Sequence, residues 1–288
     1  MGRVQRYALL VLLPGGRHHA QAQPTHDPPS PYATRSCDYA NVTRMKQTFE
    51  TAKNNLDSHG YALVDGPLEP AEATALLRQL GELVPQTTGE VAYDIQAHAG
   101  FEALRDTRSP HTLRPHTEAP GQSLPPRYLA LHCRVQATCG GGRTLLADGR
   151  HFLTTLDEDL QRLAHQHPVY WPSYEEHPDA VGVRKPVVER TPSRTVIRMS
   201  STLLRVGAYS ETLDQPTADS QPLGPGGVAL AERAVDFVER GGTSVLIPED
   251  ALLIWDNHRM FHARTGFADT RRRLTRYWVA EPAREGTP

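Results

Sequence analysis

The feature that most constrains the fold is a series of short β-rich segments separated by Gly, Pro and Asp turns. Apolar residues occupy alternate positions in residues 128–135, as in a strand. Gly140-Gly141-Gly142 then predicts a turn, and residues 143–147 a returning strand. The regular alternation of strands and helices that marks a doubly wound parallel sheet is missing. The pattern therefore predicts a mainly β chain with flanking helices (α+β), built as a sandwich or double-sheet jelly roll.

The remaining elements follow from hydrophobic periodicity. Further strands are predicted over residues 61–64, 169–171, 181–188, 195–199, 244–247, 251–255 and 273–279. Helices are predicted over residues 45–59, 69–84, 152–167 and 228–240. Helices at the front of the chain and between strands agree with a β sandwich that carries helical insertions.

The chain divides by composition into three parts. Residues 21–44 are rich in Pro, Ser, Thr and Asn, with little to bury, so we expect residues 1–44 to be a disordered N-terminal extension. Residues 45–280 form the predicted domain, and residues 281–288 a flexible tail. Two alternatives stay open for the extension. It is translated upstream sequence with a true start at Met45, or its short apolar run at residues 7–13 belongs to a signal peptide.

Composition excludes several partners. The formal net charge of −2 in 288 residues gives no field that would attract nucleic acid. No apolar run approaches the length of a membrane span. The three cysteines, Cys37, Cys133 and Cys139, match no disulfide framework or common zinc pattern and fit a reducing compartment. We expect a cytoplasmic protein that acts on a small molecule, without nucleic acid or membrane partners; the oligomeric state is not readable.

A candidate metal site begins at His116-Thr117-Glu118. A histidine and a carboxylate two residues apart on a strand point to the same face and can bind one ion together. Two histidines and one carboxylate with open positions form the ligand set of Fe(II) oxygenases. The motif alone is unspecific, because the chain holds a second copy, His177-Pro178-Asp179. We interpret that copy as a solvated loop, since it lies in a polar, proline-broken stretch.

The arginine-rich segment near the C-terminus is the second unusual feature. On a strand, Arg272, Leu274 and Arg276 share one face. Two guanidinium groups directed into an apolar barrel would be costly without anions, and a dianionic ligand would satisfy them. The run alone is equally consistent with a solvated basic edge strand.

Together these motifs resemble the taurine dioxygenase family. They are His116-x-Glu118, Gly141-Gly142-Arg143-Thr144, Trp255-Asp256-Asn257, His262-x-Arg264 and Arg272-x-x-x-Arg276. The resemblance covers about residues 49–280. Glu rather than Asp in the first motif is similar to the clavaminate synthase-like branch. The chain departs from the family pattern in its N-terminal extension and in having three glycines before Arg143 where two are usual.

The resemblance implies a double-stranded β-helix, which is a jelly roll, and a set of site residues. The Fe(II) ligands would be His116, Glu118 and His262. The distal carboxylate of 2-oxoglutarate would meet Arg272 and the hydroxyl of Thr144. Arg276 would lie near the oxoacid carboxylate and near an acidic group of the substrate.

The implied activity is oxidative decarboxylation of 2-oxoglutarate with O₂, coupled to hydroxylation of an unactivated C–H bond. The branch implies an amino acid or an amino-acid-derived metabolite as substrate. Desaturation, epoxidation or ring formation would use the same ligands. A halogenase is disfavoured, because Glu118 fills the position that chloride would need. The alternative from another class is a non-catalytic jelly-roll protein that binds a metal or ligand.

Four other residues receive a structural interpretation. We interpret His258 as a surface residue or a neighbour of the ligands, because the triad is complete without it. Asp148 is expected to be a turn residue or a helix cap, and Trp255 a core residue. Arg198 is left open between a substrate contact and ordinary surface.

Overall fold

The computed structural model describes residues 31–102, 104–105, 107–173, 181–209, 211–212 and 221–281. The chain divides into two units, Met1–Val42 and Thr43–Pro288, and the fold described below is that of the second. In the described ranges, no helix combines the length and apolarity needed to cross a bilayer.

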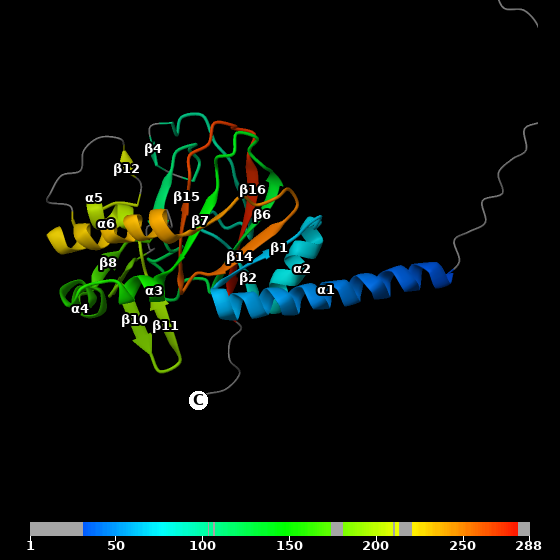
Figure 1. The fold of residues 1–288 in the computed structure, drawn as a ribbon, viewed down its shortest axis with the longest axis horizontal. Helices are drawn as coiled ribbons and strands as arrows, with labels where there is room; N and C mark the ends of the chain where they lie inside the picture. Colours follow the sequence, from blue (N-terminus) through cyan, green and yellow to red (C-terminus); the bar gives the residue numbers. More distant parts are fainter. Residues whose placement is uncertain are drawn as a thin grey trace, which may run out of the picture. The chain divides into compact units, whose positions relative to one another are not determined.

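Two antiparallel sheets form the centre of the domain (Figure 1). The larger sheet has the order β1-β14-β6-β16-β2, and β3 also pairs with β16. Its strands are β1 (Tyr61–Val64), β14 (Leu252–Asp256), β6 (Tyr128–Val135), β16 (Arg273–Ala280), β2 (Glu82–Val84) and β3 (Ala92–Ile95). The smaller sheet has the order β13-β7-β15-β5. Its strands are β13 (Thr243–Val245), β7 (Thr144–Asp148), β15 (Met260–Arg264) and β5 (Leu113–His116).

Three two-stranded pairs and six helices complete the described elements. The pairs join β8 (Val169–Trp171) to β9 (Val183–Lys185), β10 (Val188–Thr191) to β11 (Arg194–Ile197), and β4 (Leu104–Arg105) to β12 (Glu211–Thr212). The helices are α1 (Pro31–His59), α2 (Pro70–Leu80), α3 (Gly149–Thr154), α4 (Glu158–Gln166), α5 (Ser201–Val206) and α6 (Gly224–Gly241).

One apolar cluster lies between the two sheets and joins their inner faces. It includes Leu129 and Leu131 of β6, Trp255 of β14, Leu146 of β7 and Met260 of β15. Side chains from two facing sheets that share one core define a β sandwich. With the antiparallel strand order, this is the predicted jelly roll.

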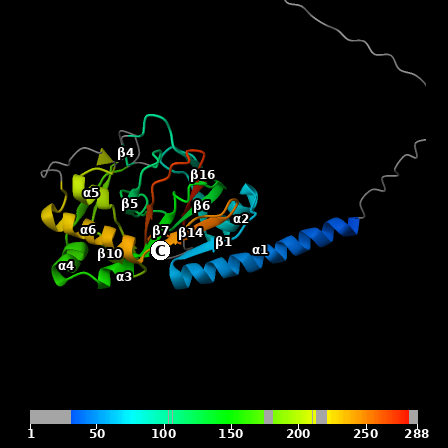
Figure 2. The same cartoon turned by 45° about the horizontal axis from the view of Figure 1, so that its top comes forward.

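The outer face of each sheet is covered by helices (Figure 2). The C-terminal part of α1 and α2 pack on the larger sheet, and α3 to α6 pack on the smaller one. Strand β14 shows the consequence, because Leu252 and Ile254 face the helices while Leu253 and Trp255 face the inner core. A strand buried on both faces is apolar throughout rather than alternating.

Two predicted helices contain a break that the sequence did not predict. The helix predicted over residues 69–84 ends at Leu80, and residues 82–84 form β2 instead. Gly81 lies between them, where a Cβ would stand 2.0 Å from the carbonyl oxygen of Ala280, so the chain passes against β16. The helix predicted over residues 152–167 is two helices, because Asp157 caps a new helix by accepting a hydrogen bond from the Leu160 amide.

Two strands of the smaller sheet were not among those derived from periodicity. Strand β15 carries His262 and Arg264 toward the interior, and Phe261 and Ala263 toward the helices. Of its inward residues only Met260 is apolar, and His262 and Arg264 are polar, so apolar alternation does not show the strand. Strand β5 has Pro115 at its third position, which weakens the strand signal. The segment predicted as one strand over residues 181–188 divides into β9 and the start of β10.

The N-terminal helix begins earlier than predicted. Helix α1 starts at Pro31, within the segment expected to be disordered, and ends at His59 as predicted. Residues 1–30 and the second motif at His177 and Asp179 lie outside the described residues. The division into an extension, a domain over residues 45–280 and a tail therefore stays a prediction.

A chain that begins at Met45 should keep the stability of the full chain. It retains the residues of α1 that contribute to the core among the described side chains, which are Met45, Phe49, Ala52 and Leu56. We expect its melting temperature to differ by less than about 2 °C, or under roughly 1 kcal/mol. The contrast is Leu56→Ala in the full chain, which should cost about 2–5 kcal/mol. A large loss on truncation, measured by thermal and urea unfolding, would contradict the prediction.

Candidate active site

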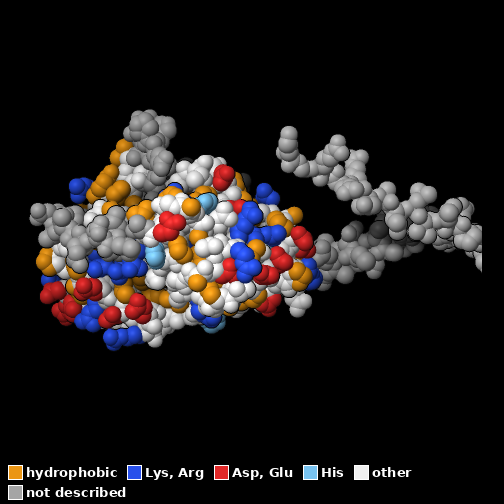
Figure 3. Space-filling model, turned by 90° about the horizontal axis from the view of Figure 1, so that it is seen from above, with side chains coloured by type: hydrophobic (Ala, Val, Ile, Leu, Met, Phe, Trp, Pro, Cys, Tyr) orange, Lys and Arg blue, Asp and Glu red, His pale blue; other side chains and the backbone are white. Residues whose placement is uncertain are grey.

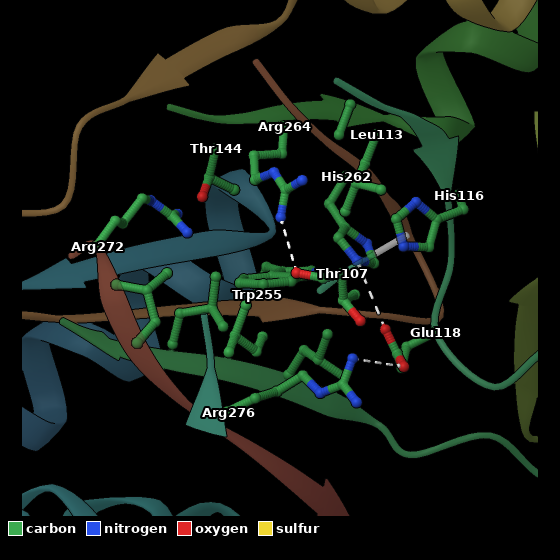
Figure 4. Close-up of a pocket in the computed structure, with 15 residues that line it drawn as sticks. Thr107, Leu113, His116, Glu118, Thr144, Trp255, His262, Arg264, Arg272 and Arg276 are labelled. Carbon is green, nitrogen blue, oxygen red and sulfur yellow. Dashed lines mark hydrogen bonds and ion pairs between the residues drawn. The ribbon is translucent and has the colours of Figure 1, made fainter. Parts of the chain in front are cut away.

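Three side chains of types that can ligate a metal converge at the inner face of the smaller sheet (Figure 4). His116 ends β5 and is the register partner of His262 in the middle of β15. The ligand atoms of His116, Glu118 and His262 lie within 4.8 Å of one another, and the two imidazole centroids are 4.0 Å apart. In the part of the chain that the structure describes, this is the one group of three or more such residues.

The protonation state of His116 suits a metal ligand. Its Nδ1 lies 2.8 Å from the carbonyl oxygen of Arg114, which can only accept, so Nδ1–H donates. The lone pair is therefore on Nε2. Burial and the neighbouring His262 lower the pKa of His116 to about 3, so the ring is neutral near pH 7.

The Glu118 carboxyl group is ionised. Burial raises its pKa, but Arg276 and the neighbouring histidines outweigh burial and lower the pKa to about 2. Arg276 Nη1 donates to Glu118 Oε1 at 3.0 Å, and the other oxygen lies 3.7 Å from His262 Nε2. Arg276 is itself held by Gln86, whose Oε1 accepts from Arg276 Nε at 2.7 Å.

The sequence argument assumed that strand alternation places Glu118 beside His116, but this is not what the structure shows. Strand β5 ends at His116, and Ala119 has a φ of 50°, so the chain turns away at once. The backbone of Glu118 is instead held by the side chain of Asn257. The two predicted ligands do share one site, but a tertiary contact brings the second one there.

Arg272 is a buried cation with unused donors. Its side chain is 1% exposed, and Nη2 donates to the carbonyl oxygen of Gly142 at 2.9 Å. Its Nε and Nη1 have no partner within the described ranges. Burial lowers its pKa to about 10, so it remains charged near pH 7. A buried charge of this kind requires a counter-ion, and Thr144, 3% exposed, lines the same cavity.

The glycine turn before β7 permits this position of Arg272. A Cβ on Gly142, whose φ is +71°, would stand 2.5 Å from Arg272 Nε. A Cβ on Gly141 would stand 2.4 Å from the carbonyl oxygen of Gly266. Glycine at both positions therefore lets the turn close over the guanidinium group.

These residues line one shared cavity. Its polar lining residues include the triad of His116, Glu118 and His262, together with Thr144, Arg272 and Arg276. Its apolar walls include Ile95, Leu129, Leu131, Trp255 and Leu274. Figure 4 shows Thr144 and Arg272 on the side of the cavity away from the triad. A short dicarboxylic acid could thus meet a cation at one end and a metal at the other.

The arginine run divides between the two interpretations left open by the sequence. Arg271 and Arg273 are exposed and pair with Asp269 and Asp94, as a solvated edge would. Arg272 and Arg276 are buried and line the cavity. The inward face predicted for Arg272, Leu274 and Arg276 is therefore confirmed.

The four residues given structural interpretations are all buried or capping. Asp148 is the cap of α3 and pairs with Arg259. Trp255 is fully buried, and it also lines the cavity. His258 is 2% exposed, so it is not a surface residue. Arg198 is fully buried and donates to the carbonyls of Pro120, Gln122 and Ser123, so neither a substrate contact nor ordinary surface describes it.

Sequence reasoning missed the roles of three residues around the site. Gln86 lies in a loop that no motif marks. Asn257 and Arg264 belong to motifs quoted for the family resemblance, but their contacts were not foreseen. Arg264 donates to three carbonyl oxygens of one segment, those of Thr107, Ser109 and His111.

Comparison with known proteins identifies the family. A model of the family "Taurine catabolism dioxygenase TauD, TfdA family" matches residues 25–278. Among curated protein sequences, none matches this chain. Since the family model covers most of the chain, the protein belongs to the TauD/TfdA family of dioxygenases. It is an Fe(II)- and 2-oxoglutarate-dependent dioxygenase, the enzyme class expected from the motifs, with O₂ as the oxidant.

Solved structures of low sequence identity share the fold. An asparagine oxygenase in complex with Fe(II), hydroxyasparagine and succinate has a TM-score of 0.64 at 16% identity, over 84% of this chain and 80% of that one. The non-heme iron oxygenase OrfP with iron and α-ketoglutaric acid has a TM-score of 0.59 at 18% identity, over 83% and 80%. The oxygenase PvcB of an isonitrile synthetic pathway has a TM-score of 0.57 at 18% identity, over 81% and 79%.

The burial of His258 predicts a pH-dependent stability. Burial lowers its pKa to about 4 from an ordinary value of 6.5, so the unfolded chain binds the proton more tightly. The stabilisation is complete above about pH 6.5 and is lost as pH falls toward 4, with a slope of at most about 1.4 kcal/mol per unit.

In metal-free protein, His258→Gln should therefore flatten the fall in unfolding free energy between pH 7 and pH 5, as measured by urea unfolding. The amide of Gln can still donate to the carbonyl of Pro125, which now lies 2.9 Å from His258 Nε2. The matched control is His59→Gln at an exposed position, which should leave the slope unchanged. An unaltered slope in His258→Gln would contradict the prediction.

Proposed function

We propose that His116, Glu118 and His262 hold the catalytic Fe(II). The observation that carries this is their convergence within 4.8 Å, with His116 neutral and Glu118 ionised. Three protein ligands leave open positions for the co-substrate and O₂, as this metal requires. The donor set thus fits the group that the enzyme class uses.

The same proposal assigns the distal carboxylate of 2-oxoglutarate to Arg272 and Thr144. It is supported by the two unpartnered nitrogens of Arg272 and by the apolar wall between Arg272 and the triad. A planar guanidinium binds carboxylate through two parallel hydrogen bonds. Arg276, at the metal end of the cavity, is the second cation and is assigned to the oxoacid carboxylate.

The protein's part in the reaction is to bind, orient and exclude water. The bound iron and O₂ supply the oxidation of 2-oxoglutarate to succinate and CO₂ and of a substrate C–H bond. Arg272 and Thr144 fix one end of the co-substrate, so its other end meets the metal in one orientation. Leu129, Leu131 and Leu274 keep the path between these ends dry.

The proposed substrate is an amino acid or an amino-acid-derived metabolite, hydroxylated at an unactivated carbon. Support comes from the asparagine oxygenase complex with hydroxyasparagine and from OrfP with hydroxyarginine. A substrate carboxylate near Arg276 would balance the positive charge of the arginines and the metal. Glu118 as the acidic ligand supports the clavaminate synthase-like branch. Desaturation, epoxidation and ring closure remain outcomes to test.

A panel of amino acids and related metabolites, assayed for substrate-dependent succinate release with product mass recorded, tests this assignment. A mass gain of one oxygen supports hydroxylation, and a loss of two hydrogens indicates desaturation or ring closure. A panel in which only non-amino-acid substrates react would overturn the proposed class.

The domain over residues 45–280 is proposed as the catalytic unit and the cytoplasm as its location. Cys133 and Cys139 are both free thiols, which supports a reducing compartment. On the face shown in Figure 3, basic and acidic side chains are interspersed, in keeping with the net charge of −2. This supports a small molecule rather than a nucleic acid as partner.

Replacement of any proposed ligand should abolish turnover and weaken iron binding. His116→Ala, Glu118→Ala and His262→Ala each leave two ligands, so we expect loss of succinate release and a fall from one bound Fe(II) per chain. The control is His177→Ala, from the second His-x-Asp motif, which should retain both properties. The ligand choice is wrong if His177→Ala loses iron and His116→Ala does not.

Arg272→Ala should weaken 2-oxoglutarate binding far more than Thr144→Ala. Loss of one partner of a buried charge pair costs about 2–5 kcal/mol, so the apparent KM should rise by tens to thousands of fold. Thr144→Ala removes one neutral donor, worth about 1 kcal/mol or several-fold. Arg272→Lys should rescue only in part, because an ammonium lacks the planar fork.

The measurement is titration of iron-loaded, oxygen-free protein with 2-oxoglutarate, followed by the visible band of the iron–oxoacid chelate. Arg271→Ala is the matched control. Arg271 is the exposed neighbour of Arg272 and pairs with Asp269 outside the cavity, so this variant should titrate like the wild type. A wild-type protein without this band would favour a non-catalytic binding protein. An Arg272→Ala protein that titrates like the wild type would refute only that assignment.

A further inference from the structure

We propose that Asn257 is a positioning residue for the metal ligand Glu118, acting through the Glu118 backbone. The proposal rests on the assignment of Glu118 as a ligand made above. The side chain of Asn257 is 1% exposed and lies in the turn between β14 and β15. It touches neither the histidines nor the cavity in any described contact.

The side-chain amide of Asn257 forms hydrogen bonds with both backbone polar groups of Glu118. Its Oδ1 accepts from the Glu118 N–H at 2.7 Å, and its Nδ2 donates to the Glu118 carbonyl at 3.1 Å. The second hydrogen of Nδ2 goes to the carbonyl of Pro126 at 3.0 Å. A neighbouring strand would make the same paired contacts, so this side chain replaces a strand where β5 has ended.

The turn between β14 and β15 is itself held by hydrogen bonds, so the Asn257 side chain is held rigidly. The Asn257 N–H donates to the Arg127 carbonyl at 2.9 Å, and Asp256 Oδ2 accepts from Arg127 Nη2 at 2.7 Å. His258 Nε2 donates to the Pro125 carbonyl at 2.9 Å. Three consecutive side chains thus bind both ends of the segment that begins at Glu118, and β15, which follows the turn, carries His262.

The consequence is geometric. Metal–ligand distances must hold within about 0.2 Å, yet Glu118 lies past its strand and next to a residue with a φ of 50°. Without Asn257, its carboxylate would be restrained mainly by the ion pair with Arg276. Mutation of a residue that orients a metal ligand typically lowers metal affinity by about 10–100-fold.

A double-mutant cycle on metal affinity tests the proposal without turnover. Co(II) is titrated calorimetrically into metal-free wild type, Asn257→Ala, Glu118→Ala and the double variant. Asn257→Ala should bind Co(II) about 10–100-fold more weakly than the wild type. In the Glu118→Ala background the same change should have an effect below about twofold, because the ligand it positions is gone. Asn257→Ser carries the test if Asn257→Ala does not fold.

The matched control is Gln136→Ala. The amide of Gln136 also bridges backbone groups, donating to the Ile247 carbonyl at 2.5 Å and accepting from the Ala137 N–H at 2.7 Å, but it does not contact the triad. It should lower the melting temperature and leave Co(II) affinity unchanged.

Two results would overturn the inference. If Asn257→Ala binds Co(II) within about threefold of the wild type while Glu118→Ala does not, Asn257 serves only the fold. Equal losses from Asn257→Ala with and without Glu118 lead to the same conclusion. If Glu118→Ala itself binds like the wild type, the ligand assignment fails first, and the inference fails with it.

Discussion

The pairing of β15 with both β5 and β7 is the constraint on which the rest of the site depends. His262 is the register partner of His116 on one side and of Leu146 on the other. Because side chains alternate along a strand, a shift of one residue would turn His262 and Arg264 outward and Phe261 and Ala263 inward. The helices that cover the outer face would then meet an imidazole and a guanidinium group. Hydrophobic packing outside the sheet thus determines which residues face the cavity inside it.

The buried charges of the cavity are compensated at one end only. Glu118 and Arg276 compensate each other at 3.0 Å, with Gln86 as the further partner of the guanidinium. Among the described residues, Arg272 has no such anion nearby and keeps two donors unused. A protein that evolved only for stability would not retain a desolvated cation without a counter-charge, since breaking or omitting one partner of a buried pair is costly. The uncompensated end of the cavity is therefore the end that a ligand must complete.

Much of this molecule is readable from its sequence, and the failures have physical causes. Strand β14, which is buried on both faces, is visible in the sequence as an apolar run, and β6 was predicted from apolar residues at alternate positions. Strand β15 is not visible in this way, because its inward residues serve the site and break the pattern. The six proposed site residues, which line one cavity, were predicted because their types and order resemble a family. The roles of Gln86 and Asn257 were not, because each contacts a residue distant in sequence: Gln86 binds Arg276, 190 positions away, and Asn257 binds Glu118, 139 positions away.

The glycine turn also explains how the chain departs from the two-glycine pattern of its family. Gly141 and Gly142 are sterically committed, one against Gly266 and the other against Arg272, whereas a Cβ on Gly140 would meet nothing within 4 Å. The surplus glycine is thus the one at the open tip. A side chain at Gly140 would have room, although its φ of +75° still favours glycine, whereas one at Gly141 or Gly142 would collide with the Gly266 backbone or with Arg272. An extra residue at the tip of this turn therefore leaves the two glycines that the site needs in place.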